Sequence, residues 1–437
     1  MDIAAAQAYL NDHINLEATA GQVEGLSLAR MRRLAAALGN PQSDYPVVHV
    51  TGTNGKGSTV RMVTALLQAH GLNVGTYTSP HLERLNERLA WNGVAIDDDT
   101  LAAVIGDVAR VEPGLGAEPA VSYFEILTAA ALRWFADLAV DVAVVEVGLL
   151  GRWDATNIAD GTVAVITNVG RDHTDRAEGW RAAIAEEKAG IVKPGSILVL
   201  GETSPELLPI FEGAGPDQVW LADRDLGCMD NRLALGGRVI DLRTPGASYD
   251  ELFLPLHGAH QGDNAALAVA AAEAFFGRPL DEEVLTEALA GVTLPGRFEV
   301  LGHRPLLVLD SAHNPDGALT LAATLEVGFA PAGRRRFVLG MLAGRDPVEM
   351  LESFGLQPSD ELIACTPGSP RALSATDVAE AAASLGLSCR RVEDVGAALA
   401  SALDGAAEDD AVIVAGSLYV VGAARAWCRA EGRLPPG

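Results

Sequence analysis

Short apolar runs alternate with longer amphipathic segments through the first half of the chain. The runs rich in Val, Ile, Leu and Ala predict buried strands at residues 47–50, 141–147, 162–167 and 197–200, and the repeat of the strand-helix pattern predicts another at residues 73–77. Apolar residues at helical spacing predict helices at residues 58–69, 123–138 and 180–191. Alternation of this kind is typical of a mostly parallel sheet covered by helices on both faces.

The pattern changes at residues 220–256, where short segments rich in Gly, Asp and Pro predict a small antiparallel insert before a helix at residues 263–276. A second alternation follows, and its strands are predicted at residues 306–310, 336–341, 361–365 and 411–415. We therefore expect an α/β protein of two domains. The larger, N-terminal domain spans residues 1–295, a linker spans 296–304, and a smaller Rossmann-like α/β domain spans 305–437.

Composition excludes several classes of protein. Of the 437 residues, 49% are hydrophobic and 21% are charged, so the chain can bury a large core. The 32 Lys and Arg against 58 Asp and Glu give a net charge of -26, which disfavours binding to nucleic acid or to an anionic membrane surface. The four cysteines form no CxxC pair, and the sequence has neither a leader pattern nor an apolar run that could span a bilayer. We expect a soluble, cytoplasmic protein.

The strongest local motif is the glycine-rich segment 51–59, Thr-Gly-Thr-Asn-Gly-Lys-Gly-Ser-Thr, which joins a predicted strand to a predicted helix. Backbone amides of such a loop converge on phosphate oxygens, a lysine reaches the terminal phosphates, and a hydroxyl can bind Mg²⁺. These roles fall to residues 53–59 and, within them, to Lys56 and Ser58. The motif departs from a strict Walker A sequence, because Val50 occupies the first glycine position and Gly57 separates Lys56 from Ser58. We therefore expect the N-terminal sheet to be of the P-loop type.

Polar residues also follow other predicted strands. Glu146 ends one strand and could bind Mg²⁺ or simply cap a helix. His173 follows another strand, where a lone histidine is more often structural than a ligand. Lys188 would ordinarily belong to a solvated helix face, but lysine occurs only three times in the chain, which favours a specific role. In the second domain, Asp310 and His313 mark another strand end beside an Asn-Pro-Asp-Gly turn.

Together the motifs resemble those of the folylpolyglutamate synthase and dihydrofolate synthase family of Mur-type ATP-dependent amide ligases. The resemblance covers nearly the whole chain and rests on segments 51–59, 79–82, 87–88, 123–125, 146–148, 151–157, 172–174, 187–191, 264–265, 296–299 and 310–317. It implies ATP-dependent ligation of L-glutamate to dihydropteroate, to the γ-carboxyl of reduced folates, or to both, through an acyl phosphate. The implied ligands are ATP, L-glutamate, the pterin substrate, two Mg²⁺ ions and, as a further candidate, a monovalent cation.

The resemblance also implies a role for each matching residue. Lys56, Lys188 and His173 would be catalytic, and Lys188 would be carried as a carbamate. Nucleotide contacts would come from Thr53, Asn54, Gly55, Lys56, Gly57, Ser58, Thr59, Asn264, Arg297, Asp310 and His313. Metal ligands or supports would be Ser58, Ser79, Glu146, His173 and Lys188. Ser417, Arg152 and Asp154 would lie on the glutamate or pterin side.

Some positions depart from the family pattern. Leu150 and Trp153 replace the usual Gly and Leu in the loop after Glu146, and Gly344 replaces an Asp. Two other hypotheses are a Mur-type ligase with a different substrate and a non-catalytic nucleotide-binding regulatory protein. Little room for a nucleotide-sugar domain precedes the glycine loop, which disfavours the first. The joint presence of Lys56, Glu146, His173 and Lys188 disfavours the second. The resemblance also favours a monomer.

Overall fold

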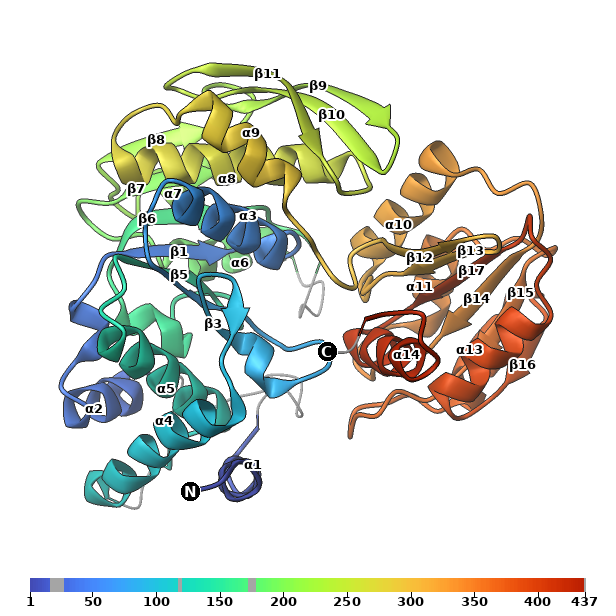
Figure 1. The fold of residues 1–437 in the computed structure, drawn as a ribbon, viewed down its shortest axis with the longest axis horizontal. Coiled ribbons are helices and arrows are strands. Elements are labelled where there is room, and N and C mark those ends of the chain that lie inside the picture. Colours follow the sequence, from blue (N-terminus) through green and yellow to red (C-terminus); the bar gives the residue numbers. More distant parts are fainter. Residues whose placement is uncertain (16–26, 117–119, 172–177, 436–437) are drawn as a thin grey trace. The chain divides into compact units, whose positions relative to one another are not determined.

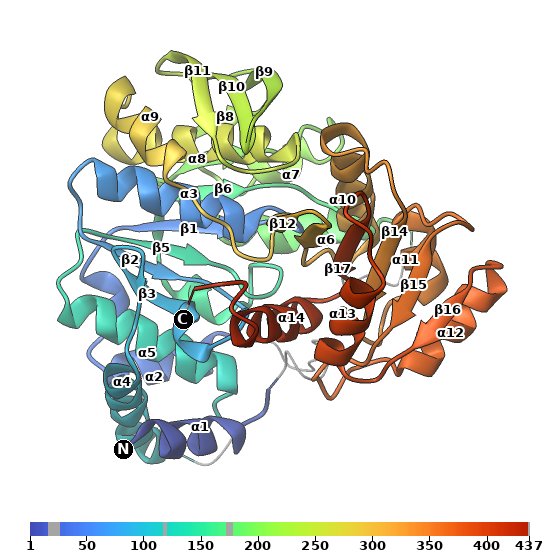
Figure 2. The same ribbon diagram turned by 45° about the vertical axis from the view of Figure 1, so that its right-hand side comes forward.

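The computed structural model describes residues 1–15, 27–116, 120–171 and 178–435 (Figure 1). The chain divides into two compact units. The first comprises the described parts of residues 1–170, 174–255 and 261–292, and the second comprises residues 256–260, Arg171 and the described part of 293–437. Each unit is an α/β structure with its own sheet, as the alternation of apolar and amphipathic segments predicts (Figure 2).

The first unit is built on a sheet with strand order β4-β3-β2-β5-β1-β6-β7-β8. Its strands are β1 (Val47–Thr51), β2 (Val74–Tyr77), β3 (Leu89–Trp91), β4 (Val94–Ala95), β5 (Val142–Glu146), β6 (Gly161–Ile166), β7 (Ile197–Leu200) and β8 (Gln218–Leu221). The strands from β2 to β8 in this order are parallel, and the edge strands β3 and β4 are antiparallel. Strand β1 therefore lies inside the sheet, with its carboxyl end flanked by those of β5 and β6.

Helices cover this sheet. Those of the first unit are α1 (Ile3–Asn11), α2 (Ala29–Ala37), α3 (Lys56–Ala69), α4 (Asp98–Val111), α5 (Tyr123–Asp137), α6 (Trp180–Ala189), α7 (Leu208–Glu212), α8 (His260–Phe276) and α9 (Glu282–Ala290). Single 3-10 turns lie at η1 (Pro41–Ser43), η2 (Leu85–Arg88), η3 (Glu112–Leu115) and η4 (Ala155–Ile158). Helix α3 packs against β1, β2 and β5.

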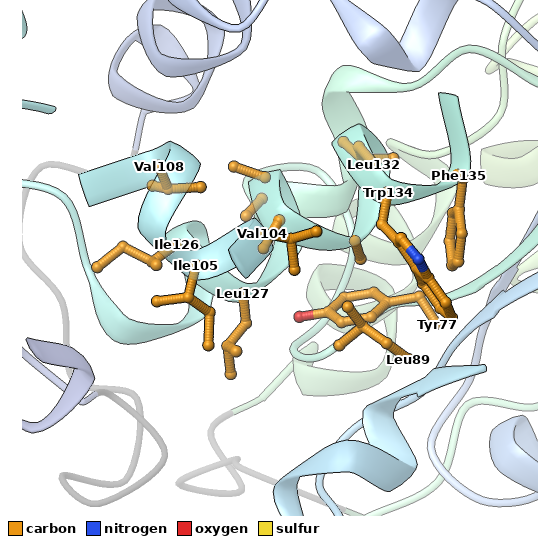
Figure 3. Packing of buried hydrophobic residues seen from close by; sticks show 14 of the residues in the cluster. Tyr77, Leu89, Val104, Ile105, Val108, Ile126, Leu127, Leu132, Trp134 and Phe135 are labelled. Carbon is orange, nitrogen blue, oxygen red and sulfur yellow. The ribbon is translucent and has the colours of Figure 1, made fainter. Parts of the chain in front are cut away.

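The core on one face of the sheet joins α4 and α5 to β2 and β3. Tyr77 and Leu89 from the strands meet Ile105, Leu127 and Phe135 from the helices, and all five are buried (Figure 3). A second cluster packs α6 and α7 against β6 and β7. Burial of apolar side chains is worth about 25 cal/mol per Å² of surface removed from water. The two clusters thus hold the central strands, and the loops that follow them, in fixed positions.

The predicted antiparallel insert is formed by residues 227–254, whereas Trp220 and Leu221 of the predicted range belong to β8. Its strands β9 (Gly227–Ala234), β10 (Gly237–Arg243) and β11 (Ser248–Leu254) make a separate sheet in the order β11-β10-β9. Helix α9 packs on β11. Helix α8 begins at His260, three residues before the predicted start.

The second unit has a sheet with strand order β12-β13-β17-β14-β15-β16. Its strands are β12 (Glu299–His303), β13 (Leu306–Leu309), β14 (Arg335–Leu339), β15 (Glu361–Ala364), β16 (Cys389–Arg391) and β17 (Ala411–Ala415). Its helices are α10 (Pro315–Gly328), α11 (Pro347–Ser353), α12 (Ala375–Ser384), α13 (Val395–Asp404) and α14 (Leu418–Ala430). All neighbouring strands are parallel except the pair β12 and β13.

The expected linker at residues 296–304 needs correction. Residues 299–303 form β12, which pairs antiparallel with β13, and the second unit begins at Thr293. The Pro and Gly residues that suggested a linker flank a short edge hairpin instead, because Gly296 adopts a positive φ of 69° and Pro305 lies at the turn before β13. None of the helices in the described ranges has the length and hydrophobicity that a membrane-spanning helix requires.

Candidate active site

The glycine-rich loop joins the carboxyl end of β1 to the amino end of α3. Two of its glycines are required by their surroundings. Gly52 has a φ of 153°, and a Cβ there would lie 1.7 Å from Thr167 Oγ1. Gly55 has a φ of 84°, and a Cβ there would lie 2.5 Å from Oδ1 of Asn264, a buried residue of α8. The loop is therefore closely enclosed by Thr167, which follows β6, and by Asn264 of α8.

Lys56 is the first residue of α3, and its side chain lies over the loop. Its Nζ donates hydrogen bonds to the carbonyl oxygens of Gly52 at 3.0 Å and Thr53 at 3.2 Å. Ser58 and Thr59 follow in the first turn and are buried. The first-turn amides of a helix have no partner inside the helix and carry partial positive charge. A lysine and these amides together provide a strongly anion-binding position.

Glu146 lies at the end of β5, next to the loop. Its Oε2 accepts a hydrogen bond from the backbone N–H of Ser79 at 3.2 Å, and a Cβ on Gly57 would lie 3.6 Å from the same oxygen. Ser79 Oγ is buried and has no hydrogen-bond partner among the described residues. Carboxylate and hydroxyl oxygens are the ligands that Mg²⁺ prefers. The donors around Glu146 therefore fit a small divalent cation.

The loop after Glu146 is fastened to the carboxyl end of α6. The N–H of Arg152 donates to the carbonyl oxygen of Glu187 at 2.8 Å, and a Cβ on Gly151 would lie 3.1 Å from Cα of Lys188. Lys188 is buried, with only 3% of its surface exposed. The exposed Arg152 side chain also donates to the carbonyl oxygen of Glu186 at 3.0 Å. The predicted residues Arg152 and Lys188 thus lie on adjoining segments of the first unit.

Leu150, one of the departures from the family pattern, has a φ of 59°, in the left-handed region that favours glycine. Its carbonyl oxygen accepts a hydrogen bond from Thr51 Oγ1 at 2.6 Å. The leucine therefore preserves the backbone conformation that a glycine would adopt at lower cost.

Asp154 is buried, and the loop itself satisfies its carboxylate. One oxygen accepts from the N–H of Leu149 at 2.9 Å, and the other accepts from the N–H of Thr156 at 3.0 Å and from its hydroxyl at 2.5 Å. Burial raises the pKa of Asp154 to about 6, although these hydrogen bonds oppose the shift. His49 Nε2 lies 2.9 Å from Thr156 Oγ1. Asp154 therefore shapes the loop through internal bonds.

The second unit brings together the polar ends of β13 and β17. Asp310 accepts hydrogen bonds from the N–H groups of Phe298 and Ala312, both at 2.7 Å. Burial raises the pKa of Asp310, and the positive charge of Arg297 opposes this. His313 Nδ1 lies 2.9 Å from the carbonyl oxygen of Ser311.

Ser417 is fully buried and caps the amino end of α14. Its Oγ accepts a hydrogen bond from the N–H of Val420 at 3.2 Å. It follows β17, whose neighbour β13 leads to Asp310. The four predicted site residues of this unit, Arg297, Asp310, His313 and Ser417, thus follow or precede neighbouring strands of one sheet.

His173 lies outside the described residues. Within the described part, no group of three or more His, Cys, Asp and Glu side chains is arranged to hold a metal ion. Two residues that the sequence analysis did not single out, Thr167 and Asn168, contact the glycine-rich loop directly. The available signal was their position at the carboxyl end of a predicted strand, the same signal that identified Glu146.

Comparisons with known proteins agree with this arrangement. Residues 50–272 match the Mur ligase middle domain, and residues 296–418 match the glutamate ligase domain of Mur ligases. The chain is 38% identical over 442 aligned residues to a dihydrofolate synthase/folylpolyglutamate synthase of Mycobacterium tuberculosis, and the alignment covers 91% of this chain and 89% of that protein.

Solved structures are similar over nearly the full length. The folylpolyglutamate synthase of Mycobacterium tuberculosis complexed with ADP superposes with a TM-score of 0.90 at 35% identity, covering 97% of each chain. A bifunctional folylpolyglutamate synthase/dihydrofolate synthase with Mn, AMPPNP and L-glutamate bound superposes with a TM-score of 0.85 at 32% identity, covering 98% of each chain.

Proposed function

This chain belongs to the Mur ligase family, among the folylpolyglutamate and dihydrofolate synthases, and we propose on that premise that it ligates L-glutamate to a pterin-linked carboxylate at the expense of ATP. The observation that carries the proposal is the glycine-rich loop with Lys56 at its helix end and the Glu146 carboxylate beside Gly57. The substrate class is supported by the similarity, over 91% of this chain, to a relative named dihydrofolate synthase/folylpolyglutamate synthase.

The reaction needs activation because a carboxylate is a poor electrophile. Transfer of the γ-phosphoryl group of ATP to a carboxylate oxygen gives an acyl phosphate and ADP. The neutral amine of glutamate then attacks the acyl carbon, an amide bond forms, phosphate leaves and a proton is released. Phosphoryl transfer between two anions needs positive charge close to the transferred group. Lys56 and the first-turn amides of α3 supply that charge, with Thr53 to Thr59 enclosing the phosphates.

We propose that Ser58, Ser79 and Glu146 hold one Mg²⁺ ion. The buried Ser79 Oγ, which has no hydrogen-bond partner among the described residues, and the adjacent Glu146 carboxylate are donors of the right chemistry. When bound, such an ion neutralises charge on the phosphates. The protein's own part is to keep Glu146 in place through the N–H of Ser79.

A second Mg²⁺ site would use His173 and a carbamate on Lys188. The neutral Nζ of Lys188 would add to CO₂ with release of a proton, which turns a buried amine into an anionic oxygen donor. Arginine cannot undergo this reaction at neutral pH, because its guanidinium stays protonated. A monovalent cation is the last member of the proposed ligand set.

In the C-terminal unit, the proposed nucleotide contacts are Arg297, Asp310 and His313, and Asn264 contributes from α8. Ser417 is proposed on the glutamate side, and Arg152 and Asp154 on the pterin side, where Asp154 would act through the shape of its loop. We further propose functional domains at residues 1–292 and 293–437, a monomer and a cytoplasmic location. The two alternatives differ from this proposal in their chemistry. Another Mur-type ligase would act on a carboxylate substrate other than a pterin, and a non-catalytic regulator would bind the nucleotide without forming an amide.

Isotope transfer tests the acyl phosphate. Dihydropteroate labelled with ¹⁸O in its carboxylate is incubated with the purified protein, Mg²⁺, ATP and L-glutamate, and the released phosphate is analysed by mass spectrometry. We expect one ¹⁸O atom in each phosphate, because the carboxylate oxygen stays on phosphorus when the amide forms. Unlabelled phosphate released together with an amide product would contradict the mechanism.

A further inference from the structure

The glycine-rich loop is bound along its side by residues 167–170, which follow β6. The side-chain amide of Asn168 bonds both backbone groups of Asn54, since its Oδ1 accepts from the N–H at 3.0 Å and its Nδ2 donates to the carbonyl oxygen at 3.1 Å. Thr167 Oγ1 donates to the same carbonyl oxygen at 2.6 Å. The N–H of Thr53 donates to the carbonyl oxygen of Asn168 at 3.1 Å.

These bonds replace a strand neighbour that the loop lacks. Strand β1 pairs with β6 up to Thr51 and Ile166, and the regular ladder ends there. A carboxamide presents a donor and an acceptor together, as a peptide group does, so one asparagine side chain can extend the pairing by one residue. Gly52 allows the close approach, because a Cβ there would lie 1.7 Å from Thr167 Oγ1.

The same bonds divide the loop's amides into two sets. The N–H groups of Thr53 and Asn54 donate to Asn168 and so are committed within the protein. The amides from Gly55 to Ser58 lie at the start of α3, where helix geometry leaves the first N–H groups without partners in the helix. Within the segment 53–59 proposed to enclose the phosphates, the amides of residues 55–58 would therefore bind phosphate oxygens, and residues 53 and 54 would fix the loop's direction.

The backbone next to Asn168 is fixed by hydrogen bonds to Glu202. The N–H of the next residue, Val169, donates to Glu202 Oε2 at 3.0 Å, and Glu202 also accepts from the N–H of Ser204 at 3.0 Å. On the loop side, the N–H of Gly170 donates to Thr53 Oγ1 at 3.0 Å. Residues 167–170 are therefore fixed by the protein's own bonds on both sides.

We infer that Asn168, assisted by Thr167, is a positioning residue that presets the glycine-rich loop for the terminal phosphates of the nucleotide. The inference rests on the proposed function, because it assumes that the nucleotide binds at this loop. A flexible loop loses conformational entropy when it becomes ordered on binding, and a loop that is already ordered avoids this loss of binding free energy. The contribution of Asn168 to affinity should therefore appear only for nucleotides with a phosphate beyond the first. Binding of the adenosine part of the nucleotide should not depend on Asn168.

The test compares ADP and AMP binding by calorimetry to the full chain and to Asn168→Ala. We expect the Kd for ADP to rise by about 10- to 100-fold, since the two part-buried bonds from the Asn168 side chain to the backbone of Asn54 are lost. The Kd for AMP, which lacks the β-phosphate, should change by less than about threefold. Asn73→Ala is the matched control. Asn73 is exposed, and its side chain bonds Asp141 at 3.2 Å at the amino ends of β2 and β5, whereas the glycine-rich loop follows the carboxyl end of β1. The Kd values of this variant for ADP and AMP should stay at wild-type levels.

Thr167 gives an independent pair of variants should Asn168→Ala not fold. Thr167→Val removes the hydroxyl at nearly constant volume and should weaken ADP binding by about tenfold, whereas Thr167→Ser keeps the hydroxyl and should restore it. Equal losses for ADP and AMP, or no loss for ADP, would overturn the inference. If the wild-type protein binds ADP but forms no product with any pterin, the proposed function fails while the loop assignment is still decided by the two Kd values.

Discussion

Lys56 is one of three lysines in a chain that otherwise uses arginine for positive charge. Lys56→Ala should lower kcat by about 10²–10³-fold, because one charged group directed at the transferred phosphoryl is lost. The free energy of unfolding should change by less than about 0.5 kcal/mol, since the side chain bonds only two loop carbonyls. Steady-state kinetics and thermal unfolding measure both quantities.

Lys193→Ala is the matched control for Lys56. Lys193 is half-buried and lies 3.8 Å from Asp160, away from the glycine-rich loop. Its removal should leave kcat near the wild-type value. A Lys56→Ala protein that unfolds at much lower temperature would instead make the loop lysine structural.

Lys188→Arg separates charge from carbamate chemistry at the buried position on α6. The variant keeps a cation but cannot add CO₂, so we expect kcat to fall by about 10- to 100-fold, as for the loss of a supporting group at a metal. The intact wild-type protein should also show a mass increase of one CO₂ under native conditions, and the variant should not. Wild-type turnover in Lys188→Arg would refute the proposed role.

Asp154 gives a pH dependence of stability. Its folded-state pKa of about 6 lies above its ordinary value of 3.8, so the folded protein holds this proton more tightly than the unfolded chain. The stability that this group contributes is therefore fully present below about pH 4 and is lost as the pH rises through 6. The free energy of unfolding of the wild type minus that of Asp154→Asn should fall by about 2–3 kcal/mol from pH 4 to 7. Chemical denaturation at several pH values measures it, and a difference that rises with pH would contradict the assignment.

At the scale of elements, Ser417 caps a helix and is also proposed to lie on the glutamate side of the site. Its hydroxyl caps α14 by accepting the N–H of Val420. Ser417→Ala should lower the free energy of unfolding by about 1 kcal/mol, as expected for the loss of an N-cap. Ser417→Asp keeps an acceptor and should recover part of that loss. If the residue also lies on the glutamate side, both variants should raise the KM for glutamate, so denaturation and kinetics together separate the two roles.

The elements near the site were largely predictable because their signals are local. The apolar run before Thr51 predicted β1, and the glycine-rich motif predicted the loop and helix that follow, although α3 begins at Lys56 and the prediction began at residue 58. The Asn168 contacts were not predictable, since they join residues 114 positions apart and depend on the register of β1 with β6. Short edge strands such as β12 and β16 also escaped prediction, because three to five residues with mixed polarity carry little periodicity.

At the scale of the molecule, the alternation of strands and helices correctly predicted the fold class. The short segments rich in Gly, Asp and Pro that begin near residue 220 correctly predicted the antiparallel insert. The second unit begins at Thr293, 12 residues before the predicted residue 305, because the expected linker belongs to that unit. The net charge of -26 has no part in the proposed chemistry, whose substrates are themselves anionic. A highly charged surface opposes self-association, which is consistent with the proposed monomer.

The most direct test of the central claim is phosphate release by the purified protein with Mg²⁺, ATP and L-glutamate, measured with dihydropteroate, with tetrahydrofolate and with no pterin. We predict release that requires both glutamate and a pterin, at more than about ten times the rate without pterin. Release with dihydropteroate establishes the dihydrofolate synthase activity, and release with tetrahydrofolate establishes the folylpolyglutamate synthase activity. Measurable ATP binding without pterin-dependent release under any of these conditions would contradict the proposed function.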